Sequence, residues 1–218
     1  MDLHEALYTT RAMRRVKPDP IPMDVQERIL DAAVRAPSGG NTQDWRFMLV
    51  DDRDLLAGLG PMYRDCIDIL WTGFYADRLA AAAEDPDSDE SKQWTRIKNS
   101  VDDAATSFEK YPLLLFAFSK GDPTGGSIFP AVWSAMLAAR AEGVGSSLTS
   151  VLLFKGDEVP NLLGVPSGEG WQMNCCVPMG YPTGRWGVAK RTPAHDVSYR
   201  NGWGNDVGFE IPDPLWPR

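Results

Sequence analysis

The chain has 218 residues, of which 43% are hydrophobic, and this suits one large domain with a sizeable core better than two domains. The net charge of −8 argues against a surface that follows nucleic-acid phosphates, because such a surface needs a surplus of Lys and Arg. Small molecules or proteins are therefore favoured as partners. The apolar runs are short and broken by charges, so we expect no membrane span and a cytoplasmic location.

The first fifty residues predict two helices and a strand. Asp2 can cap a helix from Leu3 to Thr10, and an amphipathic pattern predicts a second helix from Met23 to Arg35. Residues Trp45 to Val50 are rich in aromatic and aliphatic side chains and predict a strand inside a sheet. Between the helices, Arg11 to Lys17 holds four cations in seven residues of an acidic chain. This segment indicates a nearby anion, and the alternative is a solvated basic patch that pairs with the acidic surface.

The segment after the second helix has the composition of a binding loop. Pro37 ends the helical pattern, and the pair Gly39 and Gly40 permits positive φ and close approach of backbone to a flat ligand. Asn41 and Gln43 each supply donors and an acceptor. The loop is suited to holding a ligand, so a reactive group has to come from elsewhere. The alternative is an ordinary Gly-rich connection.

Residues 53–107 carry a mostly helical pattern, and the acidic run 84–90 within it predicts an exposed, mobile loop. We expect a single domain over residues 1–218 with a helical insertion at about residues 60–107. The insertion carries four aromatic residues that either cover a cavity or belong to the core: Trp71, Phe74, Tyr75 and Trp94.

The second half of the chain alternates apolar strands and a helix. Buried strands are predicted at Leu113–Phe118, Ser146–Phe154 and Gln172–Met179, and a deeply buried helix at Pro130–Ala141. Gly143-Val-Gly145 is not a dinucleotide fingerprint, because it follows a helix and precedes a strand, the reverse of the required order.

Residue types exclude several chemistries. The two histidines, His4 and His195, lie at opposite ends of the chain, and the sequence has neither a serine-hydrolase elbow nor a phosphate-binding Walker loop. Cys66, Cys175 and Cys176 have no CxxC spacing, so we expect buried thiols and no metal site. Paired carboxylates stay open as an alternative, because 30 acids always offer candidates. If the protein is an enzyme, a cofactor carries the reaction.

The order of these segments resembles the FMN-dependent nitroreductase family over nearly the whole chain. The matching motifs are Arg11-Ala-Met-Arg-Arg, Ala36 to Trp45, Ser127 to Arg140 with Gly143 to Thr149, and Gly180-Tyr-Pro followed by Lys190-Arg191-x-Pro193. The chain is most similar to actinobacterial members with Phe-Pro-Ala-Val-Trp in the buried helix. The resemblance implies an α+β nitroreductase-like fold with a central mixed β-sheet flanked by helices. It also implies a homodimer with a domain-swapped C-terminal extension and FMN at the interface.

The resemblance implies roles for particular residues. Arg11 and Arg191 are expected to bind the FMN phosphate, and Arg14 to lie near the flavin N1 and O2, where negative charge develops on reduction. Leu148 to Ser150 are expected to present backbone N–H groups to N5 and O4. The full set implied in FMN binding is Arg11, Ala12, Met13, Arg14, Pro37, Ser38, Gly39, Gly40, Asn41, Gln43, Leu148, Thr149, Ser150, Lys190 and Arg191, with the loop 37–43 coming from the partner subunit.

Two positions depart from the family pattern. Ala12 stands where Ser is usual, which removes a hydroxyl contact to the ribityl chain. Asp44 stands where Pro is usual, which bears on the shape of the loop and on substrate choice. Arg15 is expected to be structural.

The implied activity is hydride transfer from NADH or NADPH through FMN to a nitroaromatic, quinone or similar electrophile. No catalytic side chain is demanded, because flavin N5 carries the hydride and Arg14 gives electrostatic support. Two alternatives stay open: a protein that stores FMN without turnover, and another reductive reaction such as dehalogenation or flavin destruction. The sequence decides neither the physiological substrate nor whether the aromatic insertion closes over the site.

Overall fold

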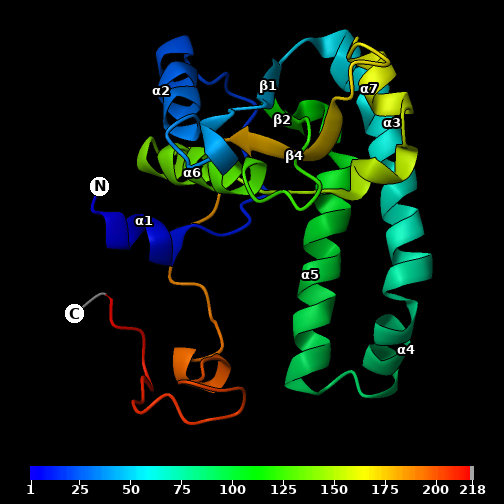
Figure 1. The fold of residues 1–218 in the computed structure, drawn as a ribbon. Coiled ribbons are helices and arrows are strands. Elements are labelled where there is room, and N and C mark those ends of the chain that lie inside the picture. Colours follow the sequence, from blue (N-terminus) through cyan, green and yellow to red (C-terminus); the bar gives the residue numbers. More distant parts are fainter. Residues whose placement is uncertain (217–218) are drawn as a thin grey trace. The chain divides into compact units, whose positions relative to one another are not determined.

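The computed structural model describes residues 1–216 (Figure 1). Contacts within the chain define two compact units. The core unit is Ala12–Gly184, and the terminal unit joins Met1–Arg11 to the residues from Arg185 onward. The expectation of a single domain stays a prediction, and the whole sheet lies within the core unit. In the described part of the chain, no helix combines the length and hydropathy needed to cross a membrane.

The core unit is built on a four-stranded sheet in the order β1-β2-β4-β3. The strands are β1 (Trp45–Val50), β2 (Leu113–Ser119), β3 (Gly145–Ser146) and β4 (Gln172–Gly180). Each neighbouring pair is antiparallel, so the expected mixed sheet is wrong for these strands. Among the described residues, parallel pairing is limited to one bridge, between Ala12 and Ser146.

Strand β2 is buried along its whole length because helices cover both faces of the sheet. Leu114, Phe116 and Phe118 face one core, shared with α3 (Arg53–Ile69), η4 (Val151–Lys155) and α7 (Glu158–Leu162). Leu113, Leu115 and Ala117 alternate with them and face a second core, shared with α2 (Met23–Ala33) and α6 (Ile128–Ala141). In Figure 1 the two groups of helices accordingly lie on opposite sides of the strands.

The predicted strand over Ser146–Phe154 is wrong beyond its first residues. Ser147 and Thr149 still donate backbone N–H groups to β4, but the chain then turns at Ser150 into the 3-10 helix η4. A short apolar run such as Val151–Phe154 does not distinguish a buried strand from a helical turn. Here Leu152 is buried while its neighbours Leu153 and Phe154 are partly exposed.

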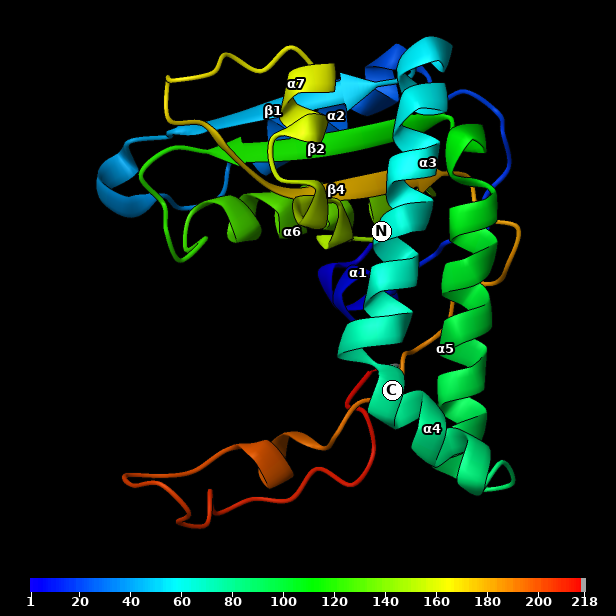
Figure 2. The same cartoon turned by 90° about the vertical axis from the view of Figure 1, so that its right-hand side faces the viewer.

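The helical pattern expected over residues 53–107 is confirmed, since helices form an arm of residues 53–106, and the interpretation of residues 60–107 as an insertion stays a prediction. The arm consists of α3, the π-helix η2 (Leu70–Phe74), α4 (Ala76–Glu84) and α5 (Asp89–Thr106), and η3 (Phe108–Lys110) follows it. Helices α3 and α5 run side by side beyond the sheet in both views (Figures 1 and 2). The acidic run 84–90 spans the end of α4 and the start of α5. Ser88 caps α5 by accepting a hydrogen bond from the Ser91 N–H.

The four aromatic residues of the arm divide between its interior and its surface. Trp71 is buried, its ring centroid lies 5.7 Å from that of Tyr75, and the Tyr75 ring lies 5.2 Å from that of Trp94. The Trp71 indole N–H donates to Asp102 at 2.7 Å. Phe74 is 70% exposed and stacks on Phe154. Three of the four therefore pack on one another inside the arm, as the core alternative requires.

The terminal unit contains α1 (Leu3–Thr9), capped by Asp2, and the 3-10 helix η5 (Ala194–Val197). The Ala189 N–H donates to the Tyr8 carbonyl, and Tyr8 also contacts the ring of Trp216. Much of its C-terminal part is irregular and carries exposed aromatic side chains, of which Trp203 is 93% exposed.

The basic segment is held against the sheet by backbone hydrogen bonds on both sides. The Met13 N–H donates to Ser146 at 3.0 Å, and the Lys17 N–H donates to Tyr181 at 2.8 Å. This approach requires glycine in the sheet: a Cβ on Gly180 would lie 2.7 Å from the Val16 Cγ2 atom, and one on Gly145 would lie 2.9 Å from the Met13 Cβ. The residues around Arg14 are therefore positioned by the sheet.

We expect Gly180→Ala to lower the free energy of unfolding by about 1–3 kcal/mol, because the added methyl overpacks the contact with Val16. Denaturant titration measures the loss. Gly187→Ala is the control, since its Cβ would meet no atom within 4 Å. Equal stability of the two variants would contradict the close packing of the segment.

Candidate active site

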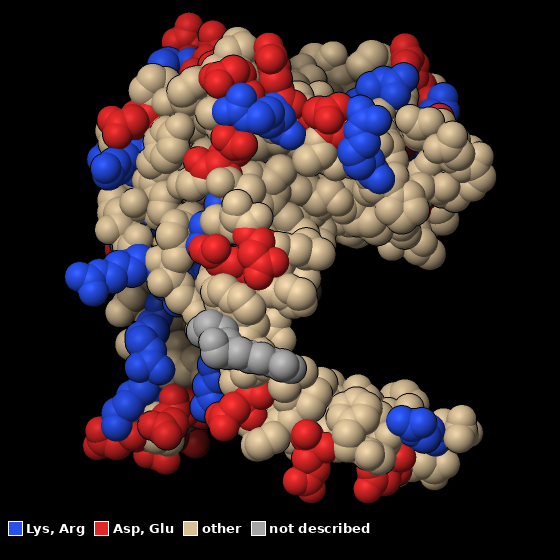
Figure 3. Space-filling model, turned by 90° about the vertical axis from the view of Figure 1, so that its left-hand side faces the viewer, with Lys and Arg blue, Asp and Glu red and all other residues tan. Residues whose placement is uncertain are grey.

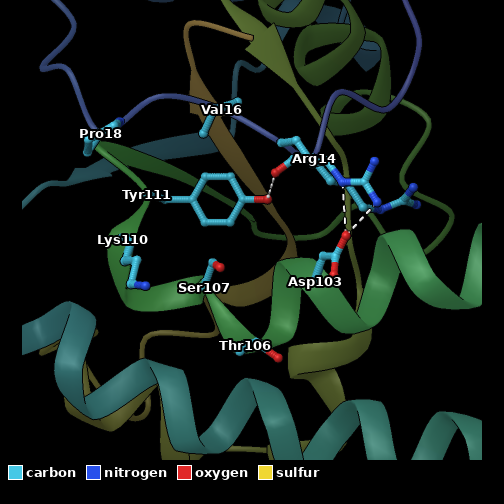
Figure 4. A pocket seen from close by; sticks show the side chains of 9 residues that line it. Arg14, Val16, Pro18, Asp103, Thr106, Ser107, Lys110 and Tyr111 are labelled. Atoms are coloured by element: carbon cyan, nitrogen blue, oxygen red, sulfur yellow. Dashed lines mark hydrogen bonds and ion pairs between the residues drawn. The ribbon is translucent and has the colours of Figure 1, made fainter. Parts of the chain in front are cut away.

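Arg14 lies beside a cluster of buried aromatic rings. The Tyr111 hydroxyl donates to the backbone carbonyl of Arg14 at 2.6 Å (Figure 4). The Tyr63 side chain hydrogen-bonds to that of Thr149, and the Phe108 ring lies between the two tyrosines, 4.1 Å from Tyr63 and 5.9 Å from Tyr111. This aromatic cluster therefore holds two of the predicted cofactor-binding segments, the one around Arg14 and the one around Thr149.

Both tyrosines of the cluster are neutral at physiological pH. Burial raises the pKa of Tyr63, and the Thr149 hydrogen bond and the charge of Arg14 lower it by less. Burial also raises the pKa of Tyr111, with a smaller opposing effect of Arg14. Both hydroxyls therefore keep their protons at neutral pH, and the Tyr111 hydroxyl keeps donating to the Arg14 carbonyl.

One predicted donor near Thr149 is not available. The Thr149 N–H donates to the Cys176 carbonyl at 2.8 Å in an antiparallel bridge, so the expectation that this group faces the flavin is wrong. The positions of Leu148 and Ser150 as donors stay predictions, and Leu148 is partly exposed.

Arg15 and Arg14 have different surroundings although they are adjacent. The Arg15 guanidinium donates to Asp103 of α5, with Nε at 2.9 Å, and both side chains are largely exposed. This pairing agrees with the expected structural role of Arg15. Among the described residues, Arg14 forms no ion pair, so its charge is free for a ligand.

The predicted binding loop, residues 37–43, holds a strained backbone. Gly40, Asn41 and Gln43 have φ of 57°, 54° and 54°, a region that costs a non-glycine residue roughly 1–3 kcal/mol. Hydrogen bonds maintain it: the Gln43 N–H donates to the Ser38 hydroxyl and the Gln43 amide to Asn41, both at 3.2 Å. Residues held in this region are concentrated at ligand sites, which supports the binding interpretation.

The loop and the Arg14 segment lie at opposite ends of the sheet. The loop leads into Trp45, which pairs with Ser119, and Ser119 pairs with Gln172 at the start of β4. Arg14 belongs to the segment that pairs with Tyr181 and Pro182, beyond the other end of β4. The eight residue steps of β4 put roughly 25 Å between the two ends. Figure 2 shows the strands running between these ends. One chain therefore does not bring these two groups of predicted site residues together.

The remaining predicted site residues belong to the terminal unit. Arg11 donates to the Arg185 carbonyl at 2.8 Å, and Arg191 donates to the Lys190 carbonyl at 3.0 Å. Lys190 and Arg191 line a pocket of about 610 Å³ together with Tyr8 and residues 211–215. Their role toward a phosphate stays a prediction.

A second pocket of about 400 Å³ opens beside Arg14 in the core unit (Figure 4). Its lining residues, called here the basic pocket, are Arg14, Arg15, Val16, Pro18, Asp103, Thr106, Ser107, Lys110 and Tyr111. Sequence reasoning missed the contribution of Ser107 and Lys110, because only tertiary packing brings them to Arg14. Tyr63 and Tyr111 carried no sequence signal that separates them from other apolar helical residues.

The cysteines are free and buried, as expected. Burial raises the pKa of Cys175 to about 12 and that of Cys176 well above its usual value. Neither thiol is a nucleophile at neutral pH.

Tyr111→Phe removes the hydroxyl that donates to Arg14 and leaves a carbonyl without this partner. We expect a loss of about 1–2 kcal/mol in the free energy of unfolding and faster amide hydrogen exchange over residues 13–17. Tyr63→Phe is the matched control, since its hydroxyl binds Thr149 instead and should leave exchange of residues 13–17 unchanged. The same exchange rates in both variants would show that Tyr111 does not hold the segment.

Comparison with known proteins identifies the family. A model of the nitroreductase family matches residues 7–181. The 5,6-dimethylbenzimidazole synthase of Rhodobacter capsulatus is 29% identical over 222 aligned positions, which cover 95% of this chain and 93% of the relative. An iodotyrosine deiodinase of Thermotoga neapolitana is 29% identical over 180 residues, 83% of this chain and 88% of the relative.

A solved structure supports the same assignment. The structure of oxidised iodotyrosine deiodinase bound to FMN and 3-iodo-L-tyrosine matches with a TM-score of 0.64 at 26% identity, over 92% of this chain and 99% of that one. Together with the family match over most of the chain, this similarity confirms the expected nitroreductase-like fold. The chain belongs to the nitroreductase family.

Proposed function

We propose that the protein is an FMN-dependent oxidoreductase that takes electrons from NADH or NADPH and reduces a nitroaromatic, a quinone or a similar small electrophile. Family membership and the FMN in a related structure support this function. The main observation behind this proposal is that two groups of predicted site residues, the Arg14 segment and the loop 37–43, lie at the two ends of one sheet. We call these two groups the half-sites. One presents Arg14, which has no ion-pair partner among the described residues and is held by the buried Tyr111 hydroxyl, and the other presents a strained loop.

The distance between the half-sites supports a homodimer. Since roughly 25 Å of β4 separates them in one chain, a cofactor that touches both lies between two copies. Helix α6 offers a surface for such contact, because Phe129 and Trp133 are one turn apart and 39% and 41% exposed. On the face in Figure 3, charged side chains gather near the top and at the lower left, and the band of surface directly below the upper cluster is mostly uncharged.

The residues around Arg14 fit the pyrimidine edge of a flavin. FMN, when bound, accepts two electrons from a nicotinamide and passes them to the acceptor. The Arg14 guanidinium supplies positive charge for the reduced, anionic ring, and its backbone is already fixed by Tyr111, so little reorganisation opposes the reaction. In the terminal unit, Arg11, Lys190 and Arg191 supply cations suited to the FMN phosphate.

A second candidate reaction is favoured by the two curated relatives. They are a 5,6-dimethylbenzimidazole synthase and an iodotyrosine deiodinase, so cleavage of the flavin itself or of a carbon–halogen bond would use the same site. Storage of FMN without turnover has less support, because three of the aromatic residues that suggested a cover pack inside the helical arm.

We expect the protein to bind about one FMN per chain and the bound flavin to lose its absorbance when NADH or NADPH is added without oxygen. Arg14→Ala should slow this reduction about 10- to 100-fold, because its charge matters most as the ring becomes anionic. Arg15→Ala, reduced with NADH, is the matched control, since its charge is paired with Asp103. Stopped-flow traces in which the control is slower than Arg14→Ala would contradict the role of Arg14.

The acceptor is identified by mixing the reduced protein with one compound at a time. Nitrofurazone or benzoquinone should reoxidise the flavin rapidly, whereas release of iodide from 3-iodotyrosine or formation of 5,6-dimethylbenzimidazole under oxygen would establish the second candidate. A flavin that neither nicotinamide reduces over minutes would overturn the proposed function and leave storage.

A further inference from the structure

The basic pocket concentrates positive charge in a protein whose net charge is −8. It is lined by three cations and one carboxylate, and that carboxylate, Asp103, is paired with Arg15. Among the described residues, neither Arg14 nor Lys110 has an ion-pair partner, although acidic residues outnumber basic ones in the chain by 30 to 22. Two unpaired cations beside one pocket indicate an anionic ligand.

The hydrogen-bonding groups of the basic pocket match a phosphate. Lys110 offers a compact ammonium and the partly buried Ser107 a hydroxyl that binds no acceptor in the described residues, while Arg14, whose guanidinium we assign to the flavin, adds positive charge at the border of the pocket. Figure 4 shows these side chains projecting from two directions, Arg14 from the segment beside the sheet and Ser107 and Lys110 from the end of the arm. Phosphate carries close to two negative charges at neutral pH, so a concentration of positive charge attracts it more strongly than it attracts a carboxylate.

The pocket lies next to the residues that we propose for the flavin ring, and this position indicates that its phosphate belongs to the reductant. Arg14 borders the pocket and also belongs to the segment that we propose for the flavin ring. When a nicotinamide stacks on that ring, the rest of the dinucleotide extends away from the reacting atom and along the neighbouring protein surface. We propose that the basic pocket binds the 2′-phosphate of NADPH, with Ser107 and Lys110 as the residues that favour NADPH over NADH. The inference that the pocket binds a phosphate depends only on its lining residues, whereas the assignment of that phosphate to NADPH rests on the proposed function.

Calorimetric titration with fragments of the dinucleotide tests the proposal without any turnover. With the FMN-loaded protein, 2′,5′-ADP should bind about tenfold more tightly than 5′-AMP, which lacks the 2′-phosphate. Lys110→Gln should remove most of this difference, and Ser107→Ala part of it. Lys92→Gln is the matched control, because Lys92 lies at the far end of α5, pairs with Asp87 and changes the net charge equally.

A further variant separates a binding role from a structural one. Asp103→Asn removes the carboxylate and frees the Arg15 guanidinium, so it should tighten 2′,5′-ADP binding about three- to fivefold. General damage to the fold would not improve binding. Lys110→Gln and Ser107→Ala should raise the KM for NADPH, and Asp103→Asn should lower it. The KM for NADH should stay the same in all three variants.

The outcomes are distinct. Equal binding of both fragments to the wild type, or an unchanged preference in Lys110→Gln, would overturn the proposal. Weaker binding of 5′-ADP to Lys110→Gln, with no gain from a 2′-phosphate, would keep the phosphate site and assign it to the pyrophosphate shared by NADH and NADPH. A fragment preference in a protein whose flavin no nicotinamide reduces would refute the proposed function and retain the phosphate site.

Discussion

The backbone pairing of residues 12–17 with the ends of β3 and β4 determines where the candidate site lies. Met13 and Lys17 bind the sheet through their N–H groups, and the glycines at positions 145 and 180 let the segment approach closely. This packing fixes Arg14 next to the Tyr63–Phe108–Tyr111 cluster. A charge on so constrained a backbone is available to a ligand without a large entropic cost.

The length of β4 then determines how a complete site is assembled. The same strand meets the Arg14 segment at one end and, through Ser119, the strained loop before Trp45 at the other. A twisted strand of nine residues neither folds back nor shortens, so the two half-sites of one chain stay apart. In the homodimer that we propose, opposite ends of two copies meet, so both halves would be satisfied at once and the symmetry would provide two such sites.

Local patterns in the sequence predicted much of this fold and part of the site. Strands β1, β2 and β4, the helical arm and the positive φ at Gly40 follow from periodicity and residue type. The left-handed backbone of Gln43 did not follow, because hydrogen bonds that Gln43 donates to Ser38 and Asn41 maintain it.

Local sequence patterns could not predict the structural features that depend on pairing between residues far apart in the chain. The apolar run after Ser146 forms a 3-10 helix because β4 pairs with it only as far as Thr149, and the same pairing uses the Thr149 N–H. Lys110 and Ser107 reach Arg14 only through the packing of the arm on the sheet. The resemblance to a family supplied the cofactor, which residue chemistry alone had indicated only as an anion and a flat ligand.

The flavin content of mixed dimers tests most directly whether two chains form each site. One chain carries Arg11→Ala with Arg14→Ala, and a differently tagged chain carries Gly40→Val, which a positive φ disfavours strongly. Each variant alone should retain little FMN, whereas purified mixed dimers should bind about one FMN, because one of their two sites combines an intact segment with an intact loop. Mixed dimers with no more flavin than either variant alone would show that both halves act within one chain and would contradict the account.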